Sequence, residues 1–299
     1  MTESSDWPPL PLAAWADTYA TLHRWTQVLG KVCLARTVRT NHFWNIAFRP
    51  GARGLETPVL SADGRSLALR FDFCSHRLVF HRSDGRREEI PLEPQTVASF
   101  YARTMDALRR LGFDTRIWTT PVEIPVDAIP FEKDESHRAY DAGSVSAFWR
   151  AVLAMRPVFE AFRARFLGKC SPVHFFWGSF DLAVTRFSGR RAPERPGADP
   201  VTREAYSHEV ISHGFWPGGG AVGEPAFYAY AAPEPADLKI ASIAPAAASY
   251  SGDLSEFLLP YDAVRRAGDP ARELTRFLES TYERAADLAG WDRASLERR

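Results

Sequence analysis

The sequence predicts an α+β protein with pseudo-two-fold symmetry, in which a unit of helix, antiparallel sheet and helix occurs twice. Apolar residues recur at helical spacing in several stretches, and short segments with alternating apolar residues lie between turn dipeptides. Several motifs also occur in the same order in both halves of the 299 residues. We therefore expect a first unit at 14–127, a connector at 128–143 and a second unit at 144–292, together one compact body.

The first unit is expected to begin with a helix. Tyr19, Leu22 and Leu29 lie at helical spacing before Gly30, which predicts a helix over 14–29. The segments that follow are bounded by Pro-Gly and Asp-Gly pairs, which are typical of turns between strands. Strands are predicted at 31–38, 42–48, 66–74 and 77–82, and a closing helix at 97–111.

The second unit is expected to repeat this order after an extended, proline-containing connector at 118–140. A long helix is predicted over 144–167, with Pro157 as a kink and Gly168 as its end. Strands are predicted at 173–187, 205–213, 226–230 and 257–259, and a last helix opens at Asp269-Pro270.

Four short matches in the same order indicate that the two units arose by duplication. They are Leu29-Gly30-Lys31 with Leu167-Gly168-Lys169, His42-Phe43-Trp44 with His174-Phe175-Phe176-Trp177, Asp72 to His76 with Glu209 to His213, and Phe100 and Thr104 with Phe277 and Thr281. Because each match falls on the same predicted element, the duplication predicts that His76 superposes on His213. A functional pocket is then expected where the units join.

The repeated acid-x-x-Ser-His pattern supplies the candidate catalytic residues Asp72, His76, Glu209 and His213. The serine beside each histidine cannot be activated by it, since neighbours on a strand point to opposite faces. If the two strands meet antiparallel, Asp72 would approach His213, and Glu209 would approach His76. Such carboxylate-imidazole pairs suit general acid-base work, and the alternative is a pair of buried structural hydrogen bonds.

Aromatic residues beside histidines, with arginines nearby, predict a pocket for a small planar or anionic molecule. The expected ligand-binding residues are His42, Trp44, His174, Trp177, Arg186 and Trp216. The alternative is that most of these aromatic side chains belong to the core.

A metal site is a further alternative. The side chains that would suit zinc or iron are His42, His174, His208 and His213, with Asp181 or Glu209 as a carboxylate. No His-x-His or His-x-x-x-His spacing occurs, so we assign no metal ligand.

Charge and composition exclude several classes of protein. The 37 basic and 37 acidic side chains cancel, which disfavours binding to nucleic acid or to an anionic membrane surface. The three cysteines lack a Cys-x-x-Cys spacing, and 45% of the residues are hydrophobic, which together favour a packed cytoplasmic protein. No membrane partner is expected, because neither a signal segment nor a long apolar run occurs.

Two long motifs carry a resemblance to a known family. The run GKCSPVHFFWGSFDLAVTRFSGR at 168–190 and FWPGGG at 215–220, with Tyr206-Ser207-His208-Glu209 between them, resemble a bacterial family known only as a domain of unknown function. The similarity covers nearly the whole chain. It implies no activity, cofactor or site residue.

The sequence therefore predicts a small-molecule-binding protein or an enzyme with an aromatic, histidine and arginine pocket at the junction of the repeats. One alternative is a noncatalytic protein-interaction or structural protein, and another is a metal-dependent hydrolase. Whether the protein is an enzyme, which cofactor it uses and its oligomeric state stay open.

Overall fold

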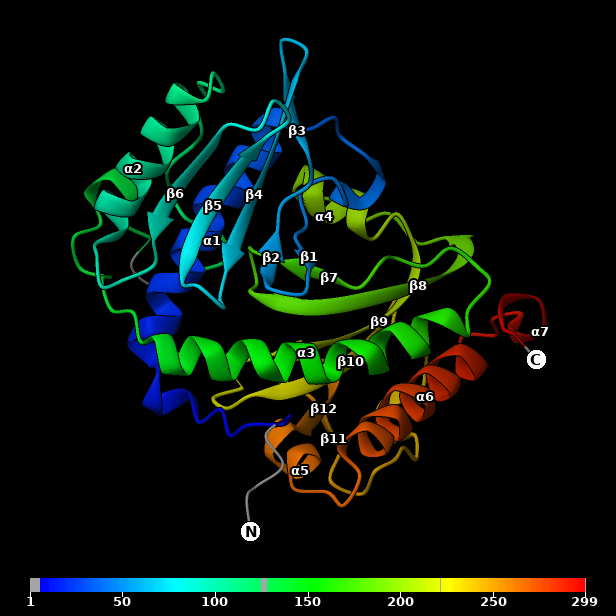
Figure 1. Ribbon diagram of the computed structural model, residues 1–299. Coiled ribbons are helices and arrows are strands. Elements are labelled where there is room, and N and C mark those ends of the chain that lie inside the picture. Colours follow the sequence, from blue (N-terminus) through cyan, green and yellow to red (C-terminus); the bar gives the residue numbers. More distant parts are fainter. Residues whose placement is uncertain (1–5, 125–127, 221, 299) are drawn as a thin grey trace.

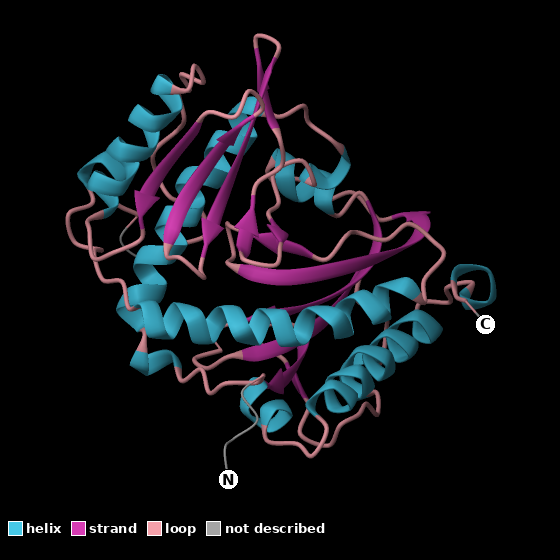
Figure 2. Ribbon diagram, in the orientation of Figure 1, coloured by secondary structure: helices cyan, strands magenta, loops and turns pink. Residues whose placement is uncertain are grey.

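The computed structural model describes residues 6–124, 128–220 and 222–298, so residues 125–127 of the expected connector lie outside the described residues. Two antiparallel sheets of six strands each are flanked by helices, which confirms the predicted α+β class (Figures 1 and 2). Along the described chain, no helix has both the length and the apolar character needed to cross a membrane.

The first sheet comes from the first half of the chain, and its strands follow one another in sequence order. They are β1 (Arg49–Pro50), β2 (Gly54–Glu56), β4 (Arg65–Asp72), β5 (Arg77–Arg82) and β6 (Arg87–Pro91), with β3 (Leu60–Ala62) paired to β4. Helices α1 (Ala16–Arg36) and α2 (Val97–Arg110) pack on this sheet.

The second sheet comes from the second half and has the order β11-β12-β10-β9-β8-β7. Its strands are β7 (His174–Phe176), β8 (Asp181–Arg191), β9 (His208–Trp216), β10 (Ala226–Ala232), β11 (Ser249–Ser251) and β12 (Glu256–Pro260). Helices α3 (Ala142–Ala164) and α6 (Pro270–Leu288) cover one face of it, and α3 crosses the middle of the view in Figure 1.

Short helices connect these elements. They are α4 (Pro200–Ala205), α5 (Tyr261–Arg265), α7 (Arg293–Leu296) and the 3-10 turns η1 (Leu12–Ala14), η2 (Asn41–Phe43), η3 (Phe131–Lys133) and η4 (Leu238–Ile240). The predicted strand at 42–48 is wrong, since η2 and a following turn occupy most of it.

The two sheets meet edge to edge at their first strands. Phe48, just before β1, and Phe175, in β7, exchange two backbone hydrogen bonds of 2.9 Å. Each half also runs from a helix through an antiparallel sheet to a helix, and in the second sheet β12 lies between β10 and β11. The repeated acid-x-x-Ser-His motif does not occupy corresponding elements of the two halves, because His76 lies in the turn between β4 and β5, whereas His213 lies within β9.

Helix α1 is largely enclosed by the rest of the chain, with every residue from 21 to 33 buried. The predicted end at Gly30 and the predicted strand at 31–38 are wrong, because the helix continues to Arg36. A Cβ at Gly30 would overlap the indole of Trp177. The glycine therefore allows a close contact between α1 and the second half, and it does not end the helix as the sequence predicts.

Candidate functional site

The two faces of the second sheet differ in chemistry. In β9, Ile211, His213 and Phe215 point to the side of α3 and α6 and are buried in the core. The alternate residues Gly214 and Trp216 point to the opposite side. On that side Tyr228, Tyr230, Asp181 and Glu256 come from the neighbouring strands, so this face carries polar and aromatic groups.

An open cavity of about 600 Å³ lies between this polar face and α1. From the first half and the segment after α2 it is lined by Tyr19, Ala20, His23, Arg24, Glu123 and Ile124. From the second half it is lined by Ser179, Asp181, Tyr206, Trp216, Gly219, Gly220, Tyr228, Tyr230, Leu254 and Glu256. Both halves of the chain thus contribute to its wall.

Asp181 is the most deeply buried of the carboxyl groups that the described residues place in the wall of this cavity. It is the first residue of β8, and only 7% of its surface is exposed. The hydroxyls of Ser179 and Tyr228 donate hydrogen bonds to its two carboxylate oxygens. Burial raises the pKa of Asp181, and these two hydrogen bonds oppose the rise because they favour the ionised form.

A missing side chain brings Tyr228 to Asp181. Tyr228 pairs with Gly214 across β10 and β9, and Gly214 in turn pairs with Ala183 of β8. A Cβ at Gly214 would overlap the phenol of Tyr228. The phenol can therefore lie across β9 and reach the carboxylate on β8.

Two further carboxyl groups share the cavity with Asp181. Burial, and then the charge of Asp181, raises the pKa of Glu123 to about 6 and that of Glu256 to about 7. The carboxyl group of Glu123 lies against Gly178, where a Cβ would overlap it. Partial loss of solvation and the like charge of Asp181 explain why both carboxyl groups hold their protons more tightly than usual, although Glu123 remains exposed to solvent.

Helix α1 supplies the basic side chains of the wall. Burial lowers the pKa of His23 to about 4, and its Nε2 lies 2.7 Å from the carbonyl oxygen of Gly178. Arg24 forms an ion pair with Asp134, with 3.3 Å between Nε and Oδ2, and both side chains are buried. His23 is therefore neutral at neutral pH, and the charge of Arg24 is balanced by Asp134.

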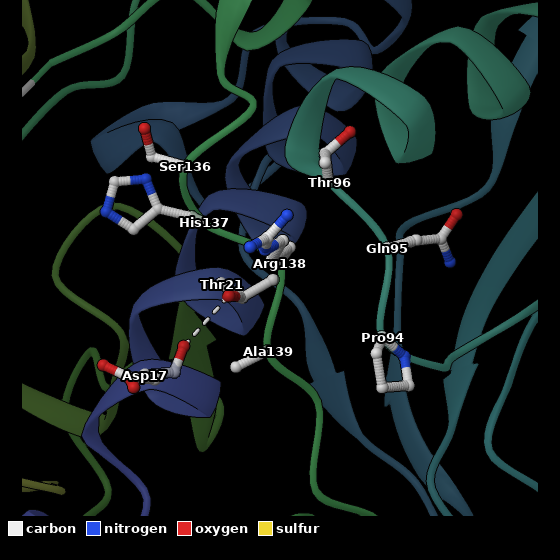
Figure 3. Close-up of a pocket in the computed structure, with 9 residues that line it drawn as sticks. All are labelled: Asp17, Thr21, Pro94, Gln95, Thr96, Ser136, His137, Arg138 and Ala139. Atoms are coloured by element: carbon white, nitrogen blue, oxygen red, sulfur yellow. Dashed lines mark hydrogen bonds between the residues drawn. The ribbon is translucent and has the colours of Figure 1, made fainter.

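A second open cavity, of about 640 Å³, lies on another side of α1 (Figure 3). Its wall contains Asp17 and Thr21 from α1 together with Gln95, Thr96 and His137 from other segments. The hydroxyl of Thr21 donates to the carbonyl oxygen of Asp17, as the dashed line in Figure 3 marks. The described residues of this lining include a single carboxyl group and no tyrosine, tryptophan or phenylalanine, so it offers less chemistry than the cavity at Asp181.

Asp72 and His76 lie away from both cavities and have local structural partners. Arg53 and Arg70 form ion pairs with Asp72. Although burial opposes the change, hydrogen bonds from Arg53 and Ser75 lower the pKa of Asp72 to about 2. Nδ1 of His76 lies 2.8 Å from the hydroxyl oxygen of Tyr140. Asp72 therefore holds the turn after β4 as a permanent anion.

The expected pairing of Asp72 with His213 and of Glu209 with His76 is wrong, because each residue has other partners. His213 has 0% of its surface exposed, and its Nε2 lies 3.0 Å from the hydroxyl of Thr281. Glu209 is bound by Arg190 and Ser188. Burial holds the pKa of His213 well below its ordinary value, so this imidazole is neutral and enclosed by core residues.

Three of the expected ligand-binding residues form a separate cluster around Lys169. Nζ of Lys169 donates to Nε2 of His42 over 2.6 Å and lies over the ring of Trp44, 5.5 Å from its centroid. The ring of Trp44 contacts that of His174. Burial and the charge of Lys169 lower the pKa of His42. These residues do not contribute to the cavity at Asp181.

The other three expected ligand-binding residues lie in three different surroundings. Trp177 packs on α1 and donates from its indole nitrogen to the carbonyl of Ile46 over 3.0 Å. Arg186, with 3% of its surface exposed, lies 3.5 Å from the ring centroid of Phe162. Trp216 alone lines the cavity at Asp181. A ligand site that joins all six residues is therefore not formed.

Among the described residues, no three His, Cys, Asp or Glu side chains are placed to ligate one metal ion. His208 and His213 point to opposite faces of β9, as their spacing on a strand predicts.

The sequence does not predict that the main residues of the cavity form one site. The sequence indicates Asp181 only as an alternative metal ligand, and Tyr228 and Tyr230 only as part of a strand. The alternation of 226–230 carries a signal, because both tyrosines share one face with Ala226, whereas Phe227 and Ala229 share the other. The segments that carry the family resemblance also converge here: Ser179 and Asp181, then Tyr206, then Trp216 with Gly219 and Gly220.

Comparison with known proteins gives a family and no activity. No curated protein and no solved structure matches the chain. A family model described as "Family of unknown function (DUF5996)" matches residues 7–298, which is nearly the whole chain. The chain therefore belongs to the family of unknown function DUF5996.

Proposed function

We propose that this chain is a small-molecule-binding protein and that the cavity between α1 and the second sheet is its binding site. The observation that carries the proposal is Asp181, a buried carboxylate at the cavity held by two hydroxyl groups and surrounded by aromatic rings. Ligand sites are typically concave, rich in aromatic and apolar surface, and equipped with a few convergent polar groups. The cavity at Asp181 has all three properties, and the other large cavity lacks the aromatic surface.

Asp181 is also the group best placed to exchange a proton with a ligand. Its pKa is raised by burial, and the pKa of Glu256 in the same cavity is raised to about 7. General acid-base groups work best when their pKa lies near the pH at which they act. Two carboxyl groups with different surroundings in one cavity are the arrangement from which acid and base roles arise.

The backbone around the cavity supports a functional role. Glu123 has a φ of 58° and Phe180, directly before Asp181, has a φ of 59°. Both are left-handed conformations that residues other than glycine adopt at a cost of roughly 1–3 kcal/mol. Strain of this kind gathers at binding and catalytic sites, where it holds a side chain in a required position.

The test is a thermal-shift screen of a metabolite library against the wild-type chain and two cavity-filling variants. Ala20→Phe fills the cavity at Asp181, and Ala139→Phe fills the cavity of Figure 3 as the matched control. A ligand present at 100 times its dissociation constant stabilises the folded state by about 2.7 kcal/mol. We expect compounds that raise the melting temperature of the wild type and of A139F but not that of A20F.

Hits that stabilise A20F as much as the wild type would contradict the proposal, because they would bind elsewhere. A library that yields no hit on the wild type would contradict it as well. The melting temperature of each unliganded variant shows beforehand that it folds.

A further inference from the structure

The cavity at Asp181 gathers negative charge that no described residue in its wall balances with a charge of its own. Asp181, Glu123 and Glu256 all face it, and the charge of Asp181 acts on both glutamates. In the wall His23 is neutral, and Arg24 is paired with the buried Asp134. A positively charged group in the cavity would therefore relieve repulsion that the folded chain already carries.

The aromatic rings of the wall provide a second, independent attraction for a cation. Tyr19, Tyr206, Trp216, Tyr228 and Tyr230 line the cavity. Tyr228 and Tyr230 stack side by side, with ring centroids 6.1 Å apart and an interplanar angle of 20°. The face of an aromatic ring attracts a cation, and cages of such rings recognise ammonium groups.

The size and donor set of the cavity indicate an organic cation. A volume of about 600 Å³ lies in the range of sites for small organic molecules. In the described part of the chain, the carboxyl groups are not placed to ligate one metal ion together. The sequence predicts an anionic ligand because of arginines such as Arg186. Arg186 does not line this cavity, because it is buried against Phe162.

From these observations we infer that the ligand is a small organic cation, whose amine or ammonium group lies among the three carboxyl groups and against the aromatic rings. This inference rests on the proposed function, and it adds the charge class of the ligand. An anion would be repelled by the same carboxyl groups. A neutral polyhydroxyl compound could contact the rings and donate hydrogen bonds to the carboxylates, but it would not reduce the repulsion between the carboxylates.

The experiment compares three probes that share one ring and differ in charge: benzylamine, benzyl alcohol and benzoate. Binding is followed by isothermal titration and by ligand-observed NMR at pH 7.5. We expect benzylamine to bind roughly tenfold or more tightly than benzyl alcohol, and benzoate not to bind. Cavity-filling A20F should lose benzylamine binding.

Variants separate charge from shape. Asp181→Asn and Glu123→Gln each remove one negative charge from the cavity, and we expect each to weaken benzylamine severalfold while leaving benzyl alcohol unchanged. Asp106→Asn removes an exposed carboxylate on α2 and should change neither affinity. Glu123→Gln keeps the test decisive if Asp181→Asn does not fold.

The outcomes distinguish the two levels of the argument. If benzyl alcohol or benzoate binds as tightly as benzylamine and A20F abolishes that binding, the cation inference is overturned while the binding cavity stands. If none of the three probes binds and the library screen also fails, the proposed function falls with the inference. Benzylamine binding that A20F and both charge variants leave intact would overturn the inference, because the cation would lie elsewhere.

Discussion

The phenol of Tyr228, on β10, reaches across β9 and donates a hydrogen bond to Asp181 on β8. Gly214 makes this contact possible, because any side chain there would occupy the space of the phenol. The three residues thus couple the packing of the sheet to the ionisation of Asp181, which faces the cavity although it is nearly fully buried. Changes at each of them have separate, measurable consequences.

Gly214→Ala should destabilise the protein by roughly 1–3 kcal/mol, because the new methyl group overlaps both the phenol of Tyr228 and the backbone oxygen of Leu182. Urea unfolding monitored by circular dichroism measures the effect. Gly252→Ala is the matched control, since a Cβ at Gly252 meets open space. Equal stabilities of the two variants would show that Gly214 does not make room for Tyr228.

Tyr228→Phe should raise the pKa of Asp181 further. The phenol donates a hydrogen bond to the carboxylate and so favours its ionised form. Without the phenolic hydroxyl, Ser179 is, among the described residues, the one side-chain donor left to oppose the rise in pKa that burial causes. The carboxyl carbon shift of Asp181, followed by NMR between pH 3 and 9, gives the value in each protein. A pKa that is unchanged or lower in Y228F would contradict the assigned hydrogen bond.

Glu256→Gln should change how stability depends on pH. The pKa of Glu256 is raised from 4.5 to about 7 on folding, so the stability that it contributes is fully present below pH 4.5 and is lost as the pH rises through 7. Glutamine does not titrate. The variant should therefore equal the wild type near pH 4.5 and exceed it by about 1–2 kcal/mol at pH 8, where solvent in the open cavity limits the effect.

Chemical denaturation at several pH values measures this difference directly. Asp106→Asn, at an exposed position, should keep a constant offset from the wild type over the same range. A difference between E256Q and the wild type that does not grow between pH 5 and 8 would show that Glu256 is not desolvated in the folded chain.

The sequence predicts elements well where one rule dominates. Strand β5 at Arg77–Arg82 has the predicted bounds, just before an Asp-Gly turn pair. Helices α2 and α6 lie where their apolar periods and their proline and glycine signals place them. Gly30 shows the limit of these rules. Gly30 leaves room for Trp177, which lies 147 residues further along the chain. The local sequence around it is nevertheless the same as around a glycine that ends a helix.

The candidate site was predicted less well than the fold, because its residues meet only through tertiary packing. The sequence predicts a strand through the motif around His76, yet Asp72 ends β4 and accepts hydrogen bonds from the backbone amides of Cys74 and Ser75, which makes a turn. The strand predicted at 205–213 overlaps β9 at 208–213, but β9 continues to Trp216 and residue 205 belongs to α4. The sequence also does not show which side of the strand faces the core. His213 therefore lies under α6, and Trp216 on the same strand faces the cavity.

The claim that the cavity at Asp181 binds the ligand is tested most directly by mapping a titration with benzylamine on the backbone amides of the wild-type chain. The account predicts saturable shift changes centred on Ala20, Ser179, Gly219 and Gly220, with the same midpoint at each. Changes confined to Gln95, Thr96 and Ser136 would place the ligand in the cavity of Figure 3 and contradict the account. Changes that fail to saturate at any of these amides would contradict it equally.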